Sequence, residues 1–293
     1  MRILVTGGSG FIGSHIIDVL LEQGHDVTNI DIKPAHRQDI KHLNGSILDR
    51  SLIDAVVRDV DAIYHIGGFS NINFVKAHPV ETIELNVLST TYLLDACRKH
   101  KVSHFIYASS VYAFDRSGHL YTTSKALSER IIEDFNSLYN ITYTILRYAT
   151  VYGPRNRNAD VIYIFVKKAI EGDPLEIHGS GMQKRNFIHV RDLAEASVKA
   201  LENTEAVNKK LVIAHSMDIS ILELAERVKD IVNPDIEVRF IESTRDNDYK
   251  GAVDNIEASY NILQWKPSIS IENGLAEMHI DIISEMRTDV KIY

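Results

Sequence analysis

The chain has 293 residues, of which 45% are hydrophobic and 25% are charged, and its formal net charge is −8. These proportions are typical of a globular protein and exclude a disordered or fibrous chain. The acidic balance argues against nucleic acid as a partner, because nucleic-acid binding requires a basic surface.

Four further features place the protein in a class. No apolar stretch approaches the ~20 residues that span a bilayer, and the sequence starts on the strand-like MRILVTGG without a signal peptide. Cys97 is the single cysteine, so no internal disulfide or thiolate metal cage can form. The 13 histidines lack metal-ligand spacing. We therefore expect a cytoplasmic protein with no membrane partner and no bound metal.

The first half of the chain alternates short β-branched runs with longer helical patterns. The expected strands are 2–6, 26–30, 62–66, 104–108 and 142–146, and the expected helices are 11–23, 51–58, 79–100 and 121–139. Strands that alternate with helices of this length indicate βαβ units. We therefore predict a Rossmann-type, doubly wound parallel α/β sheet over residues 1–154.

The pattern changes after Gly153-Pro154. Residues 155–186 are rich in Arg, Asn, Gly and Lys. A helix at 192–202, a strand at 211–214, a helix at 221–232, a strand at 237–242 and two more helical stretches are expected to follow. We interpret residues 155–293 mainly as a smaller C-terminal lobe, with about 187–215 returning to the first domain.

A glycine-rich loop joins the first strand to the first helix. Its glycines stand at 7, 10 and 13, with Phe11 and Ile12 between the last two. Gly7 permits a tight turn, Gly10 lets a pyrophosphate approach the backbone, and Gly13 lets the helix pack close to the sheet. The negative charge of such a ligand would lie at the helix N-terminus. The loop therefore predicts a dinucleotide site.

Asp31 selects the dinucleotide. It ends the second strand, 18 residues after Gly13, near the ~20-residue spacing of a carboxylate that accepts the ribose hydroxyls. The same carboxylate would repel a 2′-phosphate. We therefore predict NAD rather than NADP.

Tyr121 and Lys125 lie four residues apart, on one face of a predicted helix. We expect the lysine to lower the pKa of the tyrosine, which could then exchange a proton with a substrate hydroxyl. Ser110 lies at the carboxyl edge of the sheet and could bind the same oxygen. A second pair with this spacing, Tyr163 and Lys167, lies in an apolar helical run, where a packed tyrosine is the simpler interpretation.

Several motifs together resemble the extended short-chain dehydrogenase/reductases. They are TGGSGFIGSH, Asp31, Ala108-Ser109-Ser110, Tyr121-x-x-x-Lys125, Arg147-Tyr148 and Val151-Tyr152-Gly153-Pro154. The likeness covers essentially the whole chain, since the segment from Gly179 to Asp192, the region around Arg245 and Leu263–Pro267 also match. Within this superfamily the chain is most similar to the nucleotide-sugar epimerase/dehydratase group, typified by UDP-glucose 4-epimerase.

The resemblance implies a reaction and a set of residues. Tightly bound NAD would oxidise the sugar C4 hydroxyl, and non-stereospecific return of the hydride would give the 4-epimer. Ser110, Tyr121 and Lys125 become the catalytic set, with Tyr121 and Lys125 also contacting NAD. The remaining matches are Ser46 and Ile47 beside the cofactor, and Asn86, Thr150, Arg185 and Arg245 around a nucleotide-diphosphate sugar. Helices 79–100 and 121–139 have apolar faces of the kind that pack on a partner subunit in dimers of the family, which implies a homodimer; the sequence alone is equally compatible with packing of these faces in the core.

Some residues depart from the family pattern. Asp is usual at the position of Ser46 and Asn at that of Thr150, and the link from Ser110 to Tyr121 is short. Val111 and Tyr112 stand where dehydratases carry an Asp-Glu pair, which disfavours that dehydratase mechanism. A nucleotide-sugar dehydratase or reductase using the same triad remains an alternative, as does a non-catalytic module that senses NAD. The sequence leaves the nucleotide and the sugar open.

Overall fold

The computed structural model describes residues 1–114, 119–156, 160–242, 253 and 255–289. The chain forms two compact units. Unit 1 comprises Met1–Tyr148, Ala194–Ile213 and Asp254–Trp265, and unit 2 comprises Ala149–Leu193, Ala214–Val253 and Lys266–Tyr293. The sequence predicted one returning segment at about 187–215. In the structure the returning segment is Ala194–Ile213, which is shorter than predicted. A second segment, Asp254–Trp265, also belongs to unit 1, although the prediction had left it in the C-terminal lobe.

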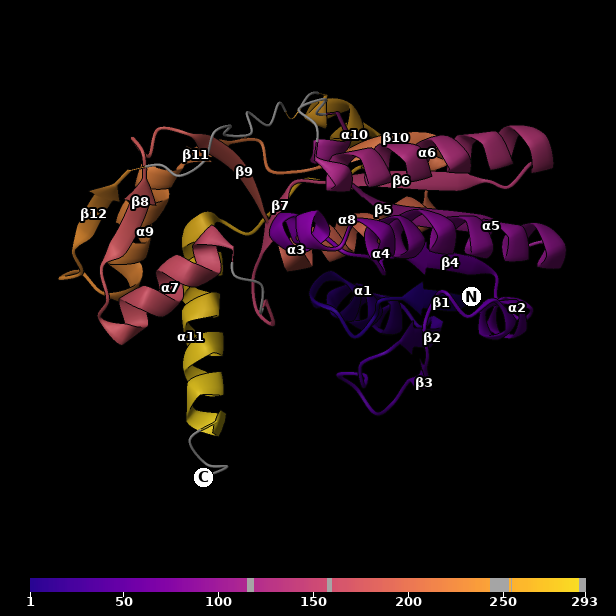
Figure 1. Cartoon of the computed structure of the whole chain (residues 1–293), viewed down its shortest axis with the longest axis horizontal. Helices are drawn as coiled ribbons and strands as arrows, with labels where there is room; N and C mark the ends of the chain where they lie inside the picture. The colour runs from indigo at the N-terminus through magenta and orange to yellow at the C-terminus, as the bar shows by residue number, and fades with distance from the viewer. Residues whose placement is uncertain (115–118, 157–159, 243–252, 254, 290–293) are drawn as a thin grey trace. The chain divides into compact units, whose positions relative to one another are not determined.

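Unit 1 is built on a seven-stranded sheet in the order β10-β6-β5-β4-β1-β2-β3, whose neighbouring strands run parallel (Figure 1). The strands are β1 (Arg2–Thr6), β2 (Asp26–Asp31), β3 (Lys41–Asn44), β4 (Ala62–His65), β5 (His104–Ser110), β6 (Tyr143–Tyr148) and β10 (Lys209–Ile213). The predicted doubly wound α/β fold is confirmed. β3 was not predicted, because its polar, partly exposed residues lack the apolar run of a buried strand.

Helices cover both faces of this sheet. α2 (Arg50–Val57), α5 (Ser89–His100) and α6 (Leu120–Tyr139) share one apolar core with the sheet. From β1 to β2 the chain crosses the sheet in one direction, and from β4 to β5 it crosses in the opposite direction. Because such crossovers are right-handed, α1 (Phe11–Glu22) lies on the face opposite to α5. Ser197 of α8 (Val190–Glu202) also lies on that other face, where it bonds Tyr64 and Tyr148. α10 (Ile256–Leu263) packs beside β10, to which Ser259 is hydrogen-bonded.

The predicted single helix at 79–100 is interrupted. It consists of α4 (Pro79–Ile83), a π-helical segment η1 (Glu84–Leu88) and α5, and it is preceded by the short α3 (Ile72–Ala77). The single-turn 3-10 segments η2 (Val111–Phe114) and η3 (Thr204–Ala206) complete unit 1. A π-helical turn inside an α-helix shifts the side chains that follow it, and such turns are often found at functional sites.

Strand order reverses between β1 and β4. In parallel sheets ligands bind beside the carboxyl ends of the strands at such a switch point. The candidate ligand site of unit 1 is therefore formed by the residues at or just beyond the carboxyl ends of β1, β4 and their neighbouring strands.

Unit 2 contains two small sheets and a separate core. Its elements are β7 (Thr150–Tyr152), α7 (Val161–Glu171), β8 (Leu175–His178), β9 (Lys184–His189), β11 (Asp218–Ser220), α9 (Ile221–Val232), β12 (Val238–Ile241) and α11 (Ile271–Asp289). The strands pair in the orders β11-β9-β7 and β12-β8, and α7, α9 and α11 contribute the core. Across the described parts of both units, none of the helices combines the length and apolarity needed to cross a membrane.

Candidate functional site

The glycine-rich loop turns tightly at the end of β1. Gly7 has a φ of +72°, and a Cβ there would lie 2.7 Å from the Cα of Gly67, which follows β4. A Cβ on Gly13 would lie 2.3 Å from the carbonyl oxygen of Gly7. Side chains at these two positions would therefore displace the backbone, as expected where a loop, a helix and a neighbouring strand end meet closely.

Gly10 is different, because its backbone is extended (φ −82°, ψ 175°) and a Cβ there would contact only the Gly7 oxygen, at 3.1 Å. Gly10 is the N-cap of α1 and offers no side chain to the first helical N–H groups, and the first turn contains no acidic residue. Free N–H groups at a helix N-terminus are suited to an anion. The loop thus fits a pyrophosphate, with Phe11, Ile12 and Gly13 supplying the first turn.

Sequence reasoning missed two residues that shape this loop. The N–H of Gly8 donates to Oδ1 of the buried Asn29 at 3.1 Å, and a Cβ on Gly8 would lie 2.4 Å from the same oxygen. Asn29 lies two residues before Asp31 on β2. An asparagine inside an otherwise buried strand was the available signal, since a buried amide needs partners.

Asp31 lies at the carboxyl end of β2 beside the loop. Its Oδ2 accepts the N–H of Ser9 at 3.1 Å and its Oδ1 accepts that of Lys33 at 2.9 Å. These two bonds fix the carboxylate, whose two oxygens can accept further hydrogen bonds. The geometry is compatible with a carboxylate that binds a pair of ribose hydroxyls.

Ser46 and Ile47 follow β3 and lie, like Asp31, at the carboxyl edge of the sheet. The hydroxyl of Ser46 accepts the N–H of Leu48 at 3.2 Å. Ile47 is buried, and its Cδ1 lies 3.2 Å from where a Cβ on Gly67 would be. Ile47 is therefore positioned beside the crevice between the ends of β1 and β4.

Ser110, Tyr121 and Lys125 come together at the end of β5. Ser110 lies close enough to Tyr121 to lower the pKa of its phenol, and the Ser110 hydroxyl accepts the N–H of Tyr112 at 3.2 Å. The ammonium of Lys125 donates to the carbonyl oxygen of Ala108 at 2.7 Å. All three side chains of the predicted set are buried. The structure thus brings together the three residues that the sequence had selected.

Burial dominates the titration of this set. It raises the pKa of Tyr121 to about 12, an effect that the neighbouring Ser110 hydroxyl opposes and the nearby phenol of Tyr112 reinforces. It also lowers the pKa of Lys125 to about 8, against the pull of Glu129. The sequence-based expectation that Lys125 lowers the pKa of Tyr121 is not met in the protein alone, where desolvation of the phenolate raises that pKa and Ser110 is the group that lowers it.

Asn86 lies in the π-helical segment η1 and is buried. Its Nδ2 donates to the carbonyl oxygen of Phe69 at 3.0 Å and to the hydroxyl of Ser124 at 3.0 Å, and its Oδ1 accepts the N–H of Phe69 at 2.8 Å. Both amide protons are used inside the protein. The amide thus ties the loop after β4 to the turn of α6 between Tyr121 and Lys125, and the assignment of Asn86 as a substrate-binding group stays a prediction.

The remaining predicted residues belong to unit 2. Thr150 on β7 is paired with Phe187 on β9. Arg185 lies two residues before Phe187 on the same strand, so it shares a face with both. Both polar side chains are half-buried. Arg245 lies outside the described residues.

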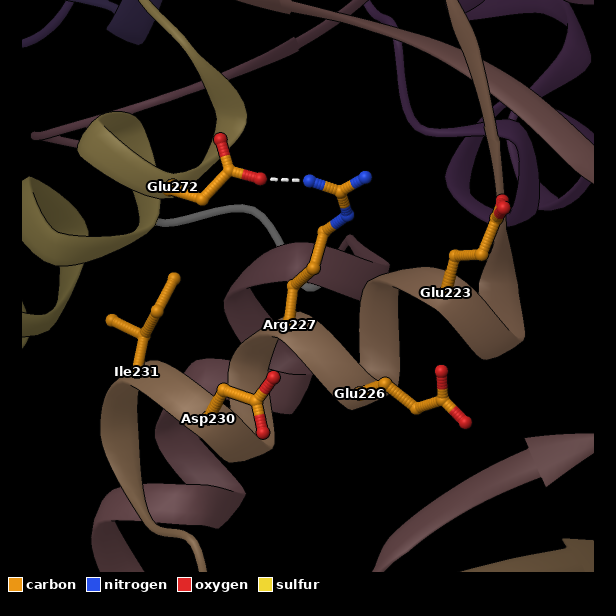
Figure 2. A pocket seen from close by; sticks show the side chains of 6 residues that line it. All are labelled: Glu223, Glu226, Arg227, Asp230, Ile231 and Glu272. Carbon is orange, nitrogen blue, oxygen red and sulfur yellow. Dashed lines mark hydrogen bonds and ion pairs between the residues drawn. The ribbon is translucent and has the colours of Figure 1, made fainter.

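Unit 2 also has a hollow of about 370 Å³ between α9 and α11, shown in Figure 2. It is lined by Glu223, Glu226, Arg227, Asp230, Ile231 and Glu272. Arg227 and Glu272 form an ion pair across it. The hollow contains none of the predicted site residues. In the described part of the chain, no three His, Cys, Asp or Glu side chains gather as a metal site would require.

Comparisons with known proteins place this geometry in a family. Residues 3–214 match the family model of the NAD dependent epimerase/dehydratase family. UDP-glucuronic acid decarboxylase 3 of Arabidopsis thaliana is 28% identical, over 96% of this chain and 89% of its own. A crystal structure of UDP-glucose 4-epimerase from Thermotoga maritima with UDP-glucose superposes with a TM-score of 0.90 at 26% identity, covering 98% of this chain and all of that one. The UDP-glucuronic acid 4-epimerase of Bacillus cereus, solved with UDP-glucuronic acid and NAD, has a TM-score of 0.88 at 26% identity, with coverages of 97% and 100%.

Proposed function

The chain belongs to the NAD-dependent epimerase/dehydratase family, and on that premise we propose that it is a nucleotide-sugar 4-epimerase. NAD is its cofactor, and the glycine loop with Asp31 is the site we assign to it. The observation that carries the proposal is the arrangement of Ser110, Tyr121 and Lys125 at the carboxyl end of β5. We place the substrate among the UDP-sugars, because the structural neighbours named above bind UDP-glucose and UDP-glucuronic acid.

The proposed chemistry divides between proton and hydride. NAD, when bound, supplies the acceptor and donor of hydride for the sugar C4. The Tyr121 oxygen takes the proton of the C4 hydroxyl and later returns it, while Ser110 orients the same substrate oxygen. Because the pKa of Tyr121 is about 12 in the protein alone, its phenolate depends on nearby positive charge, and Lys125 supplies that charge. Arg185, Thr150 and Arg245 are proposed to hold the rest of the nucleotide sugar.

The fate of the 4-keto sugar distinguishes the candidate reactions. Epimerisation needs no further acid or base, whereas elimination of water needs one, and Val111 and Tyr112 supply no carboxylate where dehydratases carry theirs. Decarboxylation is the second candidate, and the Arabidopsis relative favours it. A ketone at C4 lies β to the carboxylate of a glucuronic acid, so carbon dioxide can leave without an added protein group.

The direct test is incubation of the purified protein with UDP-, GDP- and dTDP-sugars, including UDP-glucuronic acid, followed by mass spectrometry and NMR of the products. We expect a 4-epimer of unchanged mass. Loss of 44 mass units would identify a decarboxylase, loss of 18 a dehydratase, and net consumption of NADH a reductase. Retention of NAD with no product from any sugar would instead support a sensing module.

Asp31→Asn tests the cofactor assignment. A hydrogen bond to a charged group contributes about 1.5–3 kcal/mol, so we expect the NAD affinity to fall roughly 10- to 100-fold. Because the repulsion of a 2′-phosphate is also removed, the ratio of NAD to NADP affinity should fall as well. Isothermal titration of both dinucleotides measures this.

The matched control is Asp39→Asn. Asp39 is exposed and pairs with Arg37 at 2.7 Å. It should leave both affinities unchanged. An unaltered preference for NAD in the Asp31→Asn variant would remove Asp31 from the cofactor site.

We further propose that the protein is a homodimer that associates through α6 and the neighbouring helical segment formed by α4, η1 and α5. Leu127 and Leu138 on α6 are exposed, as is Leu88 of η1. The two α6 leucines are eleven residues apart, about three turns, and so lie on one face. Sedimentation of the wild type should give a dimer, and Leu127→Glu with Leu138→Glu a monomer. Ile280→Glu, at an exposed position on α11, should remain dimeric; a monomeric wild type would contradict the proposal.

We also propose a cytoplasmic location. It is supported by the single cysteine, Cys97, which is buried in the core of unit 1 and suits a reducing compartment. Cell fractionation with an antibody to the protein tests it, and recovery in an extracytoplasmic fraction would contradict it.

A further inference from the structure

The end of β5 faces three residues of α6 and is hydrogen-bonded to two of them. The carbonyl oxygen of Ala108 accepts from Lys125 at 2.7 Å, and the next residue, Ser109, donates to Oε1 of Glu129 at 2.5 Å. The third strand residue is Ser110, which lies beside Tyr121 and lowers its pKa. Since the three helix residues follow one another at intervals of four, they form one stripe on the face of α6 that packs on the sheet.

Glu129 is enclosed by cations. Only 2% of the residue is exposed, and Arg147 on β6 donates to its two oxygens at 2.9 and 2.6 Å. The other titratable groups that face this carboxylate are Lys210 of β10, 3.5 Å away, Glu133, which shares that lysine at 2.8 Å, and the phenols of Tyr143 on β6 and Tyr107 on β5. A buried carboxylate with a bidentate guanidinium and a hydroxyl donor is held as an anion in one position.

Lys125 depends on such an anion. It lies over the ring of Tyr107 on β5, with its nitrogen 4.8 Å from the ring centroid. His65 on β4 is affected by the lysine charge and is neutral, because burial lowers the pKa of His65 to about 3. Burial also disfavours the ammonium of Lys125 and lowers its pKa to about 8, and the negative charge of Glu129 opposes this. Tyr107 and His65 supply no negative charge to Lys125. The ammonium therefore relies on Glu129, one turn further along α6.

We propose that Glu129 is a positioning residue for the reaction, which keeps Lys125 charged and seated on the end of β5 where it serves Tyr121. This inference rests on the proposed function, since the charge of Lys125 matters only if Tyr121 exchanges a proton with substrate. A purely structural Glu129 would affect folding but not the titration of the lysine.

Glu129→Gln tests the proposal, because glutamine keeps the size of the side chain and an acceptor for Ser109 but removes the charge. The pKa of the Lys125 amine is read from ¹³C NMR of lysine-labelled protein without substrate, with the resonance assigned by Lys125→Arg. A neighbouring opposite charge shifts a pKa by roughly 1–3 units. Since Glu129 acts from the next turn of the helix, we expect the pKa of Lys125 to fall by about one unit, at the lower end of that range. The alkaline limb of the kcat/KM profile should move down in pH by the same amount.

Three variants keep the test decisive. Glu133→Gln removes a carboxylate that also binds Lys210, one turn further along α6, and should leave both readouts unchanged. Glu129→Asp retains the charge and should restore the wild-type pH profile. If Glu129→Gln does not fold, Glu129→Gln with Arg147→Gln removes the buried pair together. The Lys125 pKa should still fall, because Glu129 and not Arg147 is the charge that acts on it.

An unchanged Lys125 pKa in the folded Glu129→Gln variant would overturn the inference, whatever the turnover. A shifted pKa in a protein whose wild type converts no sugar would leave Glu129 coupled to Lys125 and would overturn the proposed function instead. The NMR titration separates the two failures because it needs neither substrate nor turnover.

Discussion

Replacing Tyr121 with phenylalanine is expected to lower kcat roughly 10³-fold, within the range that a positioned acid–base group contributes. The change removes only the hydroxyl that would exchange the C4 proton. The ring remains packed, and Ser110 keeps the Tyr112 N–H as a partner, so the fold and the bound NAD should be preserved. Single-turnover assays, with the NAD content read from the absorbance spectrum, measure both effects.

The chain supplies its own control in Tyr163, which has Lys167 at the same spacing but lies on α7 of unit 2, against the core of that unit. Tyr163→Phe should retain wild-type turnover. Near-normal activity of the Tyr121→Phe variant would refute the assignment of Tyr121 as the acid–base group.

Gly13→Ala is expected to abolish NAD retention and to destabilise the protein. The added Cβ would lie 2.3 Å from the Gly7 oxygen and 2.8 Å from the Cα of Gly8, so either the loop or the start of α1 must move. Overpacking of this kind costs about 1–3 kcal/mol. Urea denaturation and the NAD content of the purified protein measure the two losses.

Gly10→Ala separates packing from ligand approach. The extended backbone of Gly10 accepts an alanine, and the new Cβ would contact only the Gly7 oxygen. The free energy of unfolding should change by less than about 1 kcal/mol, while NAD binding weakens because the methyl group occupies the position assigned to the pyrophosphate. Equal NAD affinity in this variant and the wild type would show that the pyrophosphate does not pass Gly10.

The parallel sheet was predictable because its central strands are continuous apolar runs between helical patterns. β3 was not, since its residues are polar and it lies at the edge of the sheet. The break at Glu84–Leu88 was also not predictable, because apolar spacing along 79–100 does not distinguish a π-helical turn from a regular one. Local patterns specify what one segment buries and not which hydrogen bonds it forms.

In the candidate site, too, the residues with a local sequence signal were predictable and those that depend on the rest of the fold were not. The choice of Tyr121 over Tyr163 followed from a serine-ended strand nearby in the sequence, a local signal. Glu129 gave no such signal, since a glutamate within a helix usually indicates an exposed position, and its arginine partner lies 18 residues away on β6. The pKa of Tyr121 was misjudged for a related reason. Spacing identifies a neighbouring charge, whereas burial depends on the whole surrounding fold.

Unit 1 is assembled from three separated stretches of chain, and this has a consequence for its synthesis. β10 pairs with β6 only after the intervening segment of unit 2 has been made, and α10 joins β10 later still. A nascent chain that ends near residue 154 therefore presents β6 as an open sheet edge, which can pair with other chains. Unit 1 is complete only once residue 265 has left the ribosome, and a truncation after residue 148 would lack β10 and α10.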